Sequence, residues 1–129
     1  MQLRERDKPI CVAIVDDHDA IRFAFKAACG EFGFEFCDSA GSVNELLERN
    51  PNIRCDVVVM DLSLADGSIV AENVTKLLKT GAQVVIFSIA DKQNLVRAAL
   101  RLVRQLWYQS HSPCKIWLLR FGWLPMVSM

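Results

Sequence analysis

The chain has 129 residues, of which 52% are hydrophobic and 23% are charged. This length fits one domain with one core, and the composition excludes an acidic disordered tail, a collagen and a low-complexity polymer. Fifteen basic residues balance fifteen acidic ones, so the net charge gives no reason to expect general binding to nucleic acids or acidic membranes.

The first hundred residues alternate between short apolar runs and helical patterns. The apolar runs predict strands over residues 10–15, 34–37, 55–61 and 83–88. Helical patterns follow each run, beginning near residues 19, 43, 69 and 91. Ser42 and Glu45 have the spacing of a capping box, and Gly33 marks a turn out of the first helix. This alternation predicts an α/β fold whose parallel sheet has right-handed crossovers and helices on both faces.

Polar side chains stand where the apolar runs end. Asp16 and Asp17 follow the first run, Asp61 ends the third and Ser88 ends the fourth. In an open parallel sheet, ligands collect beyond the carboxyl ends of the strands. Neighbouring carboxylates repel one another unless a cation lies among them, and oxygen ligands of this kind suit Mg²⁺. The pattern therefore predicts metal-assisted phosphoryl chemistry, although a single strand-end Asp is more often only a helix cap.

Three motifs over residues 10–100 resemble the receiver domains of bacterial two-component response regulators. They are Val15-Asp16-Asp17-His18, Val58-Val59-Met60-Asp61-Leu62-Ser63-Leu64 with Asp66-Gly67, and Ile86-Phe87-Ser88-Ile89-Ala90. The resemblance implies a flavodoxin-like, doubly wound sheet of strand order 2-1-3-4-(5), with the fifth strand and last helix in doubt. The histidine after the acidic pair resembles the subfamily with a LuxR-type output module.

The resemblance also implies roles for individual residues. Asp61 would be the phosphoacceptor, taking a phosphoryl group from a sensor histidine kinase. Asp16, Asp17, Asp61 and the backbone carbonyl of Ser63 would hold Mg²⁺. Ser88 would donate its hydroxyl to the new phosphate and start the switch. Such a domain is a stoichiometric phosphoacceptor with at most weak self-dephosphorylation, and not an enzyme.

Several nearby residues receive no such role. His18 is interpreted as a helix-start or surface residue. Asp66 and Gly67 are interpreted as turn formers, and Lys92 and Lys115 as solvated side chains.

The chain after residue 100 departs from this pattern. Residues 1–91 have a net charge of −6 and residues 92–129 a net charge of +6, and all three tryptophans lie in the second stretch. The family's fifth-strand lysine is missing near Gln109 and Ser110. Permitted codons read in a shifted frame across 104–110 encode Ala-Ala-Ala-Val-Val-Ser-Lys-Ser, which supplies a strand and a lysine at that place. We therefore divide the chain into a receiver-like core, 1–100, and an atypical basic tail, 101–129, and interpret the tail as frameshifted.

If the tail is part of the protein, the sequence predicts no fifth strand and no last helix. The strand at 83–88 would then be an unpaired edge, and part of one sheet face would be uncovered. The tryptophan-rich tail would either cover that surface in a non-native way or drive homodimer formation or higher self-association through exposed apolar side chains. No DNA-binding output domain is expected in this chain.

The cysteines and the two ends of the chain argue against disulfides, a zinc site and a membrane span. Five cysteines without a C-x-x-C pair favour neither a disulfide framework nor a zinc site. The charged start of the chain lacks a signal sequence, and residues 116–129 are too short an apolar stretch to span a bilayer. We expect a cytoplasmic protein without a membrane partner.

The sequence is compatible with three functions. The acidic residues and Ser88 favour a phosphoacceptor domain, whereas the altered tail favours a receiver-like interaction module that is not phosphorylated and self-associates. A metal-dependent phosphatase is less favoured because Leu62 and Ser63 follow Asp61 where a second acidic or basic group is usual. Specific DNA binding is not expected, although the basic tail could bind nucleic acid nonspecifically at low salt.

Overall fold

One mixed sheet forms the centre of the molecule. The computed structural model describes residues 9–62, 69–87, 95–108, 116–119 and 123–125. Within these ranges the strands follow the order β2-β1-β3-β4-β5-β6. Their bounds are β1 (Cys11–Val15), β2 (Glu35–Ala40), β3 (Val57–Asp61), β4 (Gln83–Phe87), β5 (Ile116–Leu119) and β6 (Trp123–Pro125). The first five strands are parallel, and β6 pairs antiparallel with β5.

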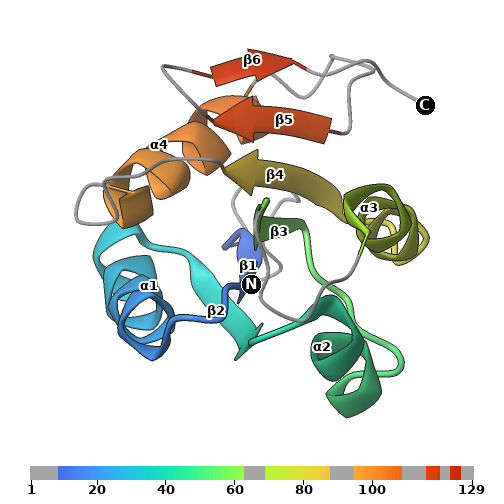
Figure 1. Ribbon diagram of the computed structural model, residues 1–129. Helices are drawn as coiled ribbons and strands as arrows, with labels where there is room; N and C mark the ends of the chain where they lie inside the picture. Colours follow the sequence, from blue (N-terminus) through green and yellow to red (C-terminus); the bar gives the residue numbers. More distant parts are fainter. Residues whose placement is uncertain (1–8, 63–68, 88–94, 109–115, 120–122, 126–129) are drawn as a thin grey trace, which may run out of the picture.

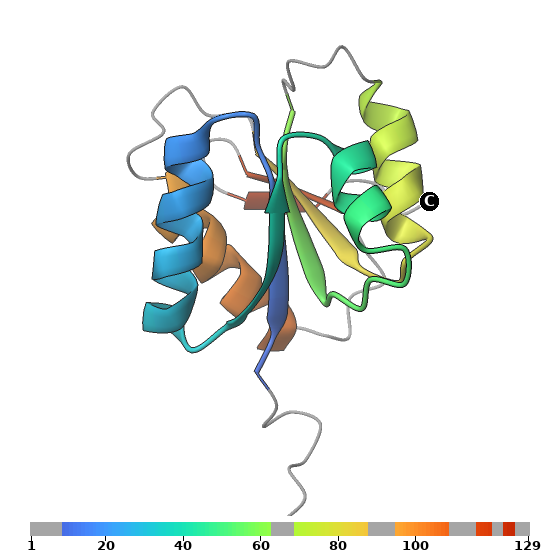
Figure 2. The same ribbon diagram turned by 90° about the horizontal axis from the view of Figure 1, so that it is seen from below.

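The helices cover both faces of this sheet. They are α1 (Asp19–Phe32), α2 (Val43–Arg49), α3 (Val70–Leu78) and α4 (Leu95–Tyr108). Figures 1 and 2 show α1 and α4 on one face and α2 and α3 on the other. The predicted α/β class and the strand order 2-1-3-4-5 are therefore confirmed.

The central strands are apolar because both of their faces are buried. In β1, Val12 and Ile14 pack in the core under α1 and α4, whereas Ala13 and Val15 pack in the core under α2 and α3. All four side chains are at most 1% exposed. This two-sided burial explains why the sequence shows a continuous apolar run instead of an alternating one.

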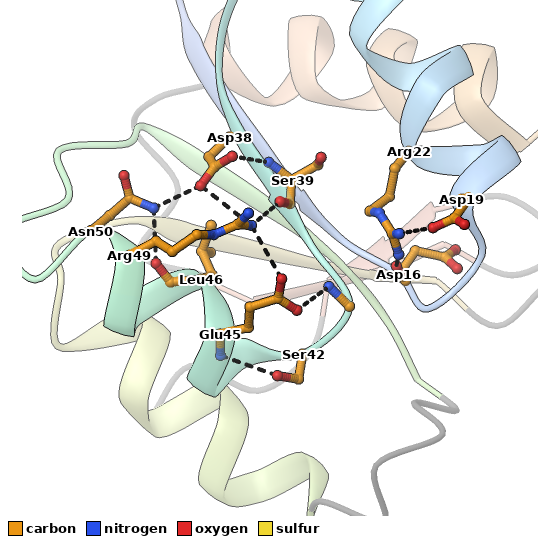
Figure 3. A network of polar contacts seen from close by, with 11 residues as sticks. Asp16, Asp19, Arg22, Asp38, Ser39, Ser42, Glu45, Leu46, Arg49 and Asn50 are labelled. Atoms are coloured by element: carbon orange, nitrogen blue, oxygen red, sulfur yellow. Dashed lines mark hydrogen bonds and ion pairs between the residues drawn. The ribbon is translucent and has the colours of Figure 1, made fainter.

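Local signals fix where the helices begin and end. The Ser42 hydroxyl accepts a hydrogen bond from the Glu45 backbone N–H at 3.1 Å, and the Glu45 carboxylate accepts one from the Gly41 N–H at 3.1 Å. Figure 3 shows this predicted capping box beside the side chain of Arg49, which bonds the Ser39 carbonyl. Gly33 ends α1 with a φ of 76°, a left-handed conformation that glycine adopts without strain.

The region after residue 100 differs from the expectation. The strand β5 pairs with β4 from Val84–Ile116 to Phe87–Leu119, so the prediction that β4 is an unpaired edge is wrong. The helix α4 also continues past Leu100 to Tyr108 and covers the sheet beside α1. The physical reason is that Ile116 and Trp117 are apolar side chains on opposite faces of the sheet. Both are only 4% exposed once β5 pairs with β4.

The last crossover has the opposite hand to the others. The connections β2-α2-β3 and β3-α3-β4 move across the sheet in the same direction with their helices on the α2 and α3 face. The connection β4-α4-β5 moves in that direction too, but its helix lies on the α1 face. It is therefore left-handed, in contrast to the predicted right-handed crossover, which is the rule in about 98% of such units.

The packing of α4 can be measured by substitution. Leu100 is fully buried in the core beneath α1 and α4, whereas its neighbour Arg101 is exposed. We expect Leu100→Ala to lower the free energy of unfolding in urea by about 2–5 kcal/mol, because it leaves a cavity. The matched variant Arg101→Ala should change it by less than about 0.5 kcal/mol. Equal, small effects of both substitutions would contradict this placement of α4.

Candidate metal centre

Two buried carboxylates lie at the same edge of the sheet. Asp16 follows β1 directly, and Asp61 is the last residue of β3. Because Val15 pairs with Met60 in parallel register, the two aspartates leave their strands side by side. Their exposed fractions are 0% and 4%, which is unusual for aspartate.

The backbone around these aspartates is held by hydrogen bonds. The Asp16 N–H donates to the Ala40 carbonyl at 3.0 Å, which ties the end of β1 to β2. The Arg22 guanidinium donates to the Asp16 carbonyl and also pairs with Asp19, as Figure 3 shows. On the other side, the Leu62 N–H donates to the Phe87 carbonyl at 3.0 Å. These hydrogen bonds therefore tie the ends of four strands together, and Arg22 adds a bond from the first turn of α1.

Four potential ligand atoms converge at this edge. One atom from each of Asp16, Asp17, His18 and Asp61 lies within 4.8 Å of the others. The Nδ1 atom of His18 is 2.8 Å from Asp16 Oδ1 and 2.9 Å from Asp17 Oδ1. The structure therefore brings together the three predicted aspartates, which we call the acidic cluster, and adds His18 to them.

The contacts of His18 were missed by the sequence analysis. Its backbone N–H also donates to Asp16 Oδ1 at 2.8 Å. This bond from an aspartate side chain to the backbone N–H two residues later is that of an Asx turn. The imidazole itself is 56% exposed, so it closes the cluster on the solvent side. The available signal was its position immediately after two aspartates at a strand end, where any side chain lies near both carboxylates.

The chemistry of this donor set fits a hard divalent cation. Three carboxylates provide oxygen ligands in a small space, and two of them are almost fully buried, so their mutual repulsion is weakly screened. Oxygen ligands with room for water are what Mg²⁺ prefers. Ser63 and Ser88, the other predicted site residues, and Lys115 lie outside the described residues.

Comparison with known proteins identifies the family. The sequence matches the family of the response regulator receiver domain over residues 12–104. The chain belongs to this family. No curated protein sequence matched the chain. The acidic cluster thus stands at the carboxyl edge of a receiver domain of two-component signalling.

Solved structures agree with this fold at low sequence identity. The receiver domain of the Erythrobacter litoralis PhyR response regulator is 21% identical, with a TM-score of 0.54, and the match covers 61% of this chain and 62% of that one. A LuxR-family response regulator from an Aurantimonas species is 20% identical, with a TM-score of 0.57 and coverages of 76% and 87%. Salmonella typhimurium RcsB is 13% identical, with a TM-score of 0.53 and coverages of 75% and 49%.

The match to this chain thus spans less than two thirds of the PhyR chain and about half of that RcsB chain. Among the helices of the described residues, none has the length and apolar character needed to cross a membrane.

The position of His18 generates a test. Its imidazole pairs with the two carboxylates that a hard cation needs, so it competes with Mg²⁺ for them. An exposed pair of this kind contributes at most about 1 kcal/mol, and we therefore expect His18→Ala to bind Mg²⁺ up to about five-fold more tightly in a calorimetric titration.

The control for this titration is Phe23→Ala, which changes an exposed side chain of α1 and should leave the affinity unchanged. A weaker affinity for Mg²⁺ in His18→Ala would show instead that the imidazole supports the cation.

Proposed function

We propose that this receiver domain accepts a phosphoryl group on Asp61 from a phosphohistidine of a sensor histidine kinase. The observation that carries the proposal is the meeting of Asp61 with Asp16 and Asp17 at the carboxyl edge of the sheet. A strand-end carboxylate held beside two further carboxylates is a nucleophile with a cation site next to it.

The chemical step follows from that arrangement. A carboxylate oxygen of Asp61 attacks phosphorus, an O–P bond forms, and the P–N bond to the donor imidazole breaks. The electron pair of that bond stays on the imidazole nitrogen, which takes a proton, and Asp61 becomes an acyl phosphate. The backbone of β3 and its bond from Leu62 to Phe87 keep the nucleophile in place during the exchange.

The acidic cluster would hold Mg²⁺ in this step, with Asp16, Asp17, Asp61 and the Ser63 carbonyl as ligands. When bound, this cation offsets the negative charge that gathers on the transferring phosphoryl group. Ser88 follows Phe87, the register partner of Asp61, and would donate its hydroxyl to the phosphate. The His18 imidazole must leave the carboxylates of Asp16 and Asp17 as the cation enters.

A second candidate function is a receiver-like interaction module that is not phosphorylated and self-associates. The observation that favours it is the arrangement after β4, where α4 lies beside α1 and a β5-β6 hairpin ends the sheet. A lysine is missing at the expected position near residue 109, so one phosphate contact of the family is absent. This arrangement changes the surface made by α4 and β5, through which phosphorylation at Asp61 would be transmitted.

Intact-mass spectrometry separates the two candidates. After treatment with acetyl phosphate, we expect one phosphoryl group per chain only when Mg²⁺ is present, and none in Asp61→Asn. The matched control is Asp56→Asn, which changes a carboxylate that bonds the Cys11 N–H outside the acidic cluster. A folded wild-type chain without an adduct would rule out the phosphoacceptor and favour the interaction module.

We also propose that the chain descends from regulators of the LuxR type and that residues from about 101 onward arise from a shifted reading frame. The support is the histidine after the acidic pair, the abrupt change of charge, and the strand and lysine that permitted codons encode in the other frame. Sequencing of the coding DNA tests this directly. The frameshift origin of the tail would be refuted if the second reading frame of that DNA encodes no strand, no lysine and no amphipathic helix.

A further inference from the structure

Three of the cysteines meet at the opposite end of the same strands. Cys11 begins β1, Cys37 lies in β2, and Cys55 lies two residues before β3. All three pack against the core under α2 and α3, and their sulfurs lie within 4.8 Å of one another. We call these residues the thiol cluster. No zinc site was expected from the sequence, because the five cysteines include no C-x-x-C pair.

The thiol cluster is built into the sheet. The Cys11 N–H donates to Asp56 Oδ2 at 2.8 Å, and the Asp56 N–H donates to the Cys11 carbonyl at 2.9 Å. The Cys55 thiol donates to the carbonyls of Cys11 at 3.3 Å and Val57 at 3.0 Å. Parallel strands, and not local sequence, therefore hold the three sulfurs together.

The spacing fits a tetrahedral ion with thiolate ligands. With Zn–S bonds of about 2.3 Å, two sulfurs of such a site are about 3.8 Å apart. The observed limit of 4.8 Å means that each pair needs to close by at most about 1 Å. Cys55 is buried, whereas Cys11 and Cys37 are half-buried, so an ion has a route to the sulfurs from the surface.

The charges around the thiol cluster favour a divalent ion over a monovalent one. The carboxylates of Glu35 and Asp56 act on Cys11, and that of Asp38 acts on Cys37. Three thiolates beside these carboxylates form a strongly negative site, which a doubly charged cation offsets better than Cu⁺. The Asp56 carboxylate is held by the Cys11 N–H, so the fourth ligand of the ion would be a water molecule.

We propose that Cys11, Cys37 and Cys55 form a zinc site at the end of the sheet opposite the acidic cluster. The site joins β1, β2 and β3 through one ion. It is independent of phosphorylation at Asp61 because it uses none of the residues of the acidic cluster.

The experiment uses Co²⁺ as a probe of sulfur ligation in the reduced, metal-free full chain. Saturating Mg²⁺ blocks the acidic cluster, which contains no sulfur. We expect thiolate-to-Co²⁺ charge-transfer absorption in the near ultraviolet that saturates at one ion per chain and disappears when Zn²⁺ is added. No such absorption by the folded wild-type chain would overturn the proposal.

Variants assign the ligands. Cys37→Ser changes a half-buried side chain and should weaken Zn²⁺ binding at least about 100-fold, since loss of even an outer partner costs about 10- to 100-fold. The matched control is Cys29→Ala, which removes a buried thiol of α1 on the other side of the sheet and should leave Zn²⁺ binding unchanged. Equal losses in both variants, or binding unchanged in Cys37→Ser, would refute the assignment.

Alkylation gives a second readout that does not depend on a variant. Zn²⁺ should slow the reaction of Cys37 with iodoacetamide, as measured by peptide mapping. Cys29 should stay unreactive with or without the ion, because its side chain is only 1% exposed and the reagent cannot reach it. Alkylation of Cys37 at the same rate with and without Zn²⁺ would contradict the site, as would a disulfide between two of the three cysteines that forms in place of metal binding.

Discussion

The parallel pairing of β3 with both β1 and β4 is the constraint on which the rest of the structure depends. The register of Val15 with Met60 places Asp16 beside Asp61, and that of Asp61 with Phe87 brings the end of β4 to the same edge. These strands are almost completely buried, so the carboxylates at their ends are poorly solvated. A cation would offset their repulsion in the proposed reaction. In this structure the Nδ1 atom of His18 lies 2.8 Å from Asp16 Oδ1.

The left-handed crossover follows from what α4 buries. Its apolar side chains pack under the same face as α1, and each fully buried aliphatic side chain contributes about 1.5–3 kcal/mol. Arg97 pairs with Glu31 at 3.0 Å, and Arg104 donates to the Phe32 carbonyl at 2.6 Å. With β5 continuing into β6 and not into a helix, α4 covers the sheet beside α1. Burial of this face thus outweighs the usual preference for the right-handed connection.

Local patterns predicted β1, β3 and β4 because each is a buried apolar run with a polar residue at or just after its end, as in Val57–Asp61. For β2, whose side chains are mostly only partly buried, they predicted 34–37, whereas the strand runs over Glu35–Ala40. They also predicted the capping box of Ser42, which needs only three residues of separation. They failed for Ile116–Leu119, since four apolar residues become a strand only through distant pairing with β4. The thiol cluster was missed for the same reason, because residues far apart in sequence meet only across paired strands.

The acidic cluster and the thiol cluster lie at opposite ends of the sheet and are linked to different strands. The acidic cluster is linked to β4 by the Leu62–Phe87 bond, and Phe87 packs in the core that α4 shares with α1. The thiol cluster involves β1, β2 and β3 but no residue of β4. An ion bound there would stiffen three strands and leave β4 and α4 free to respond to the phosphate. Under the proposed function, the α1-α4 contact is therefore the first surface that a change at Asp61 would reach.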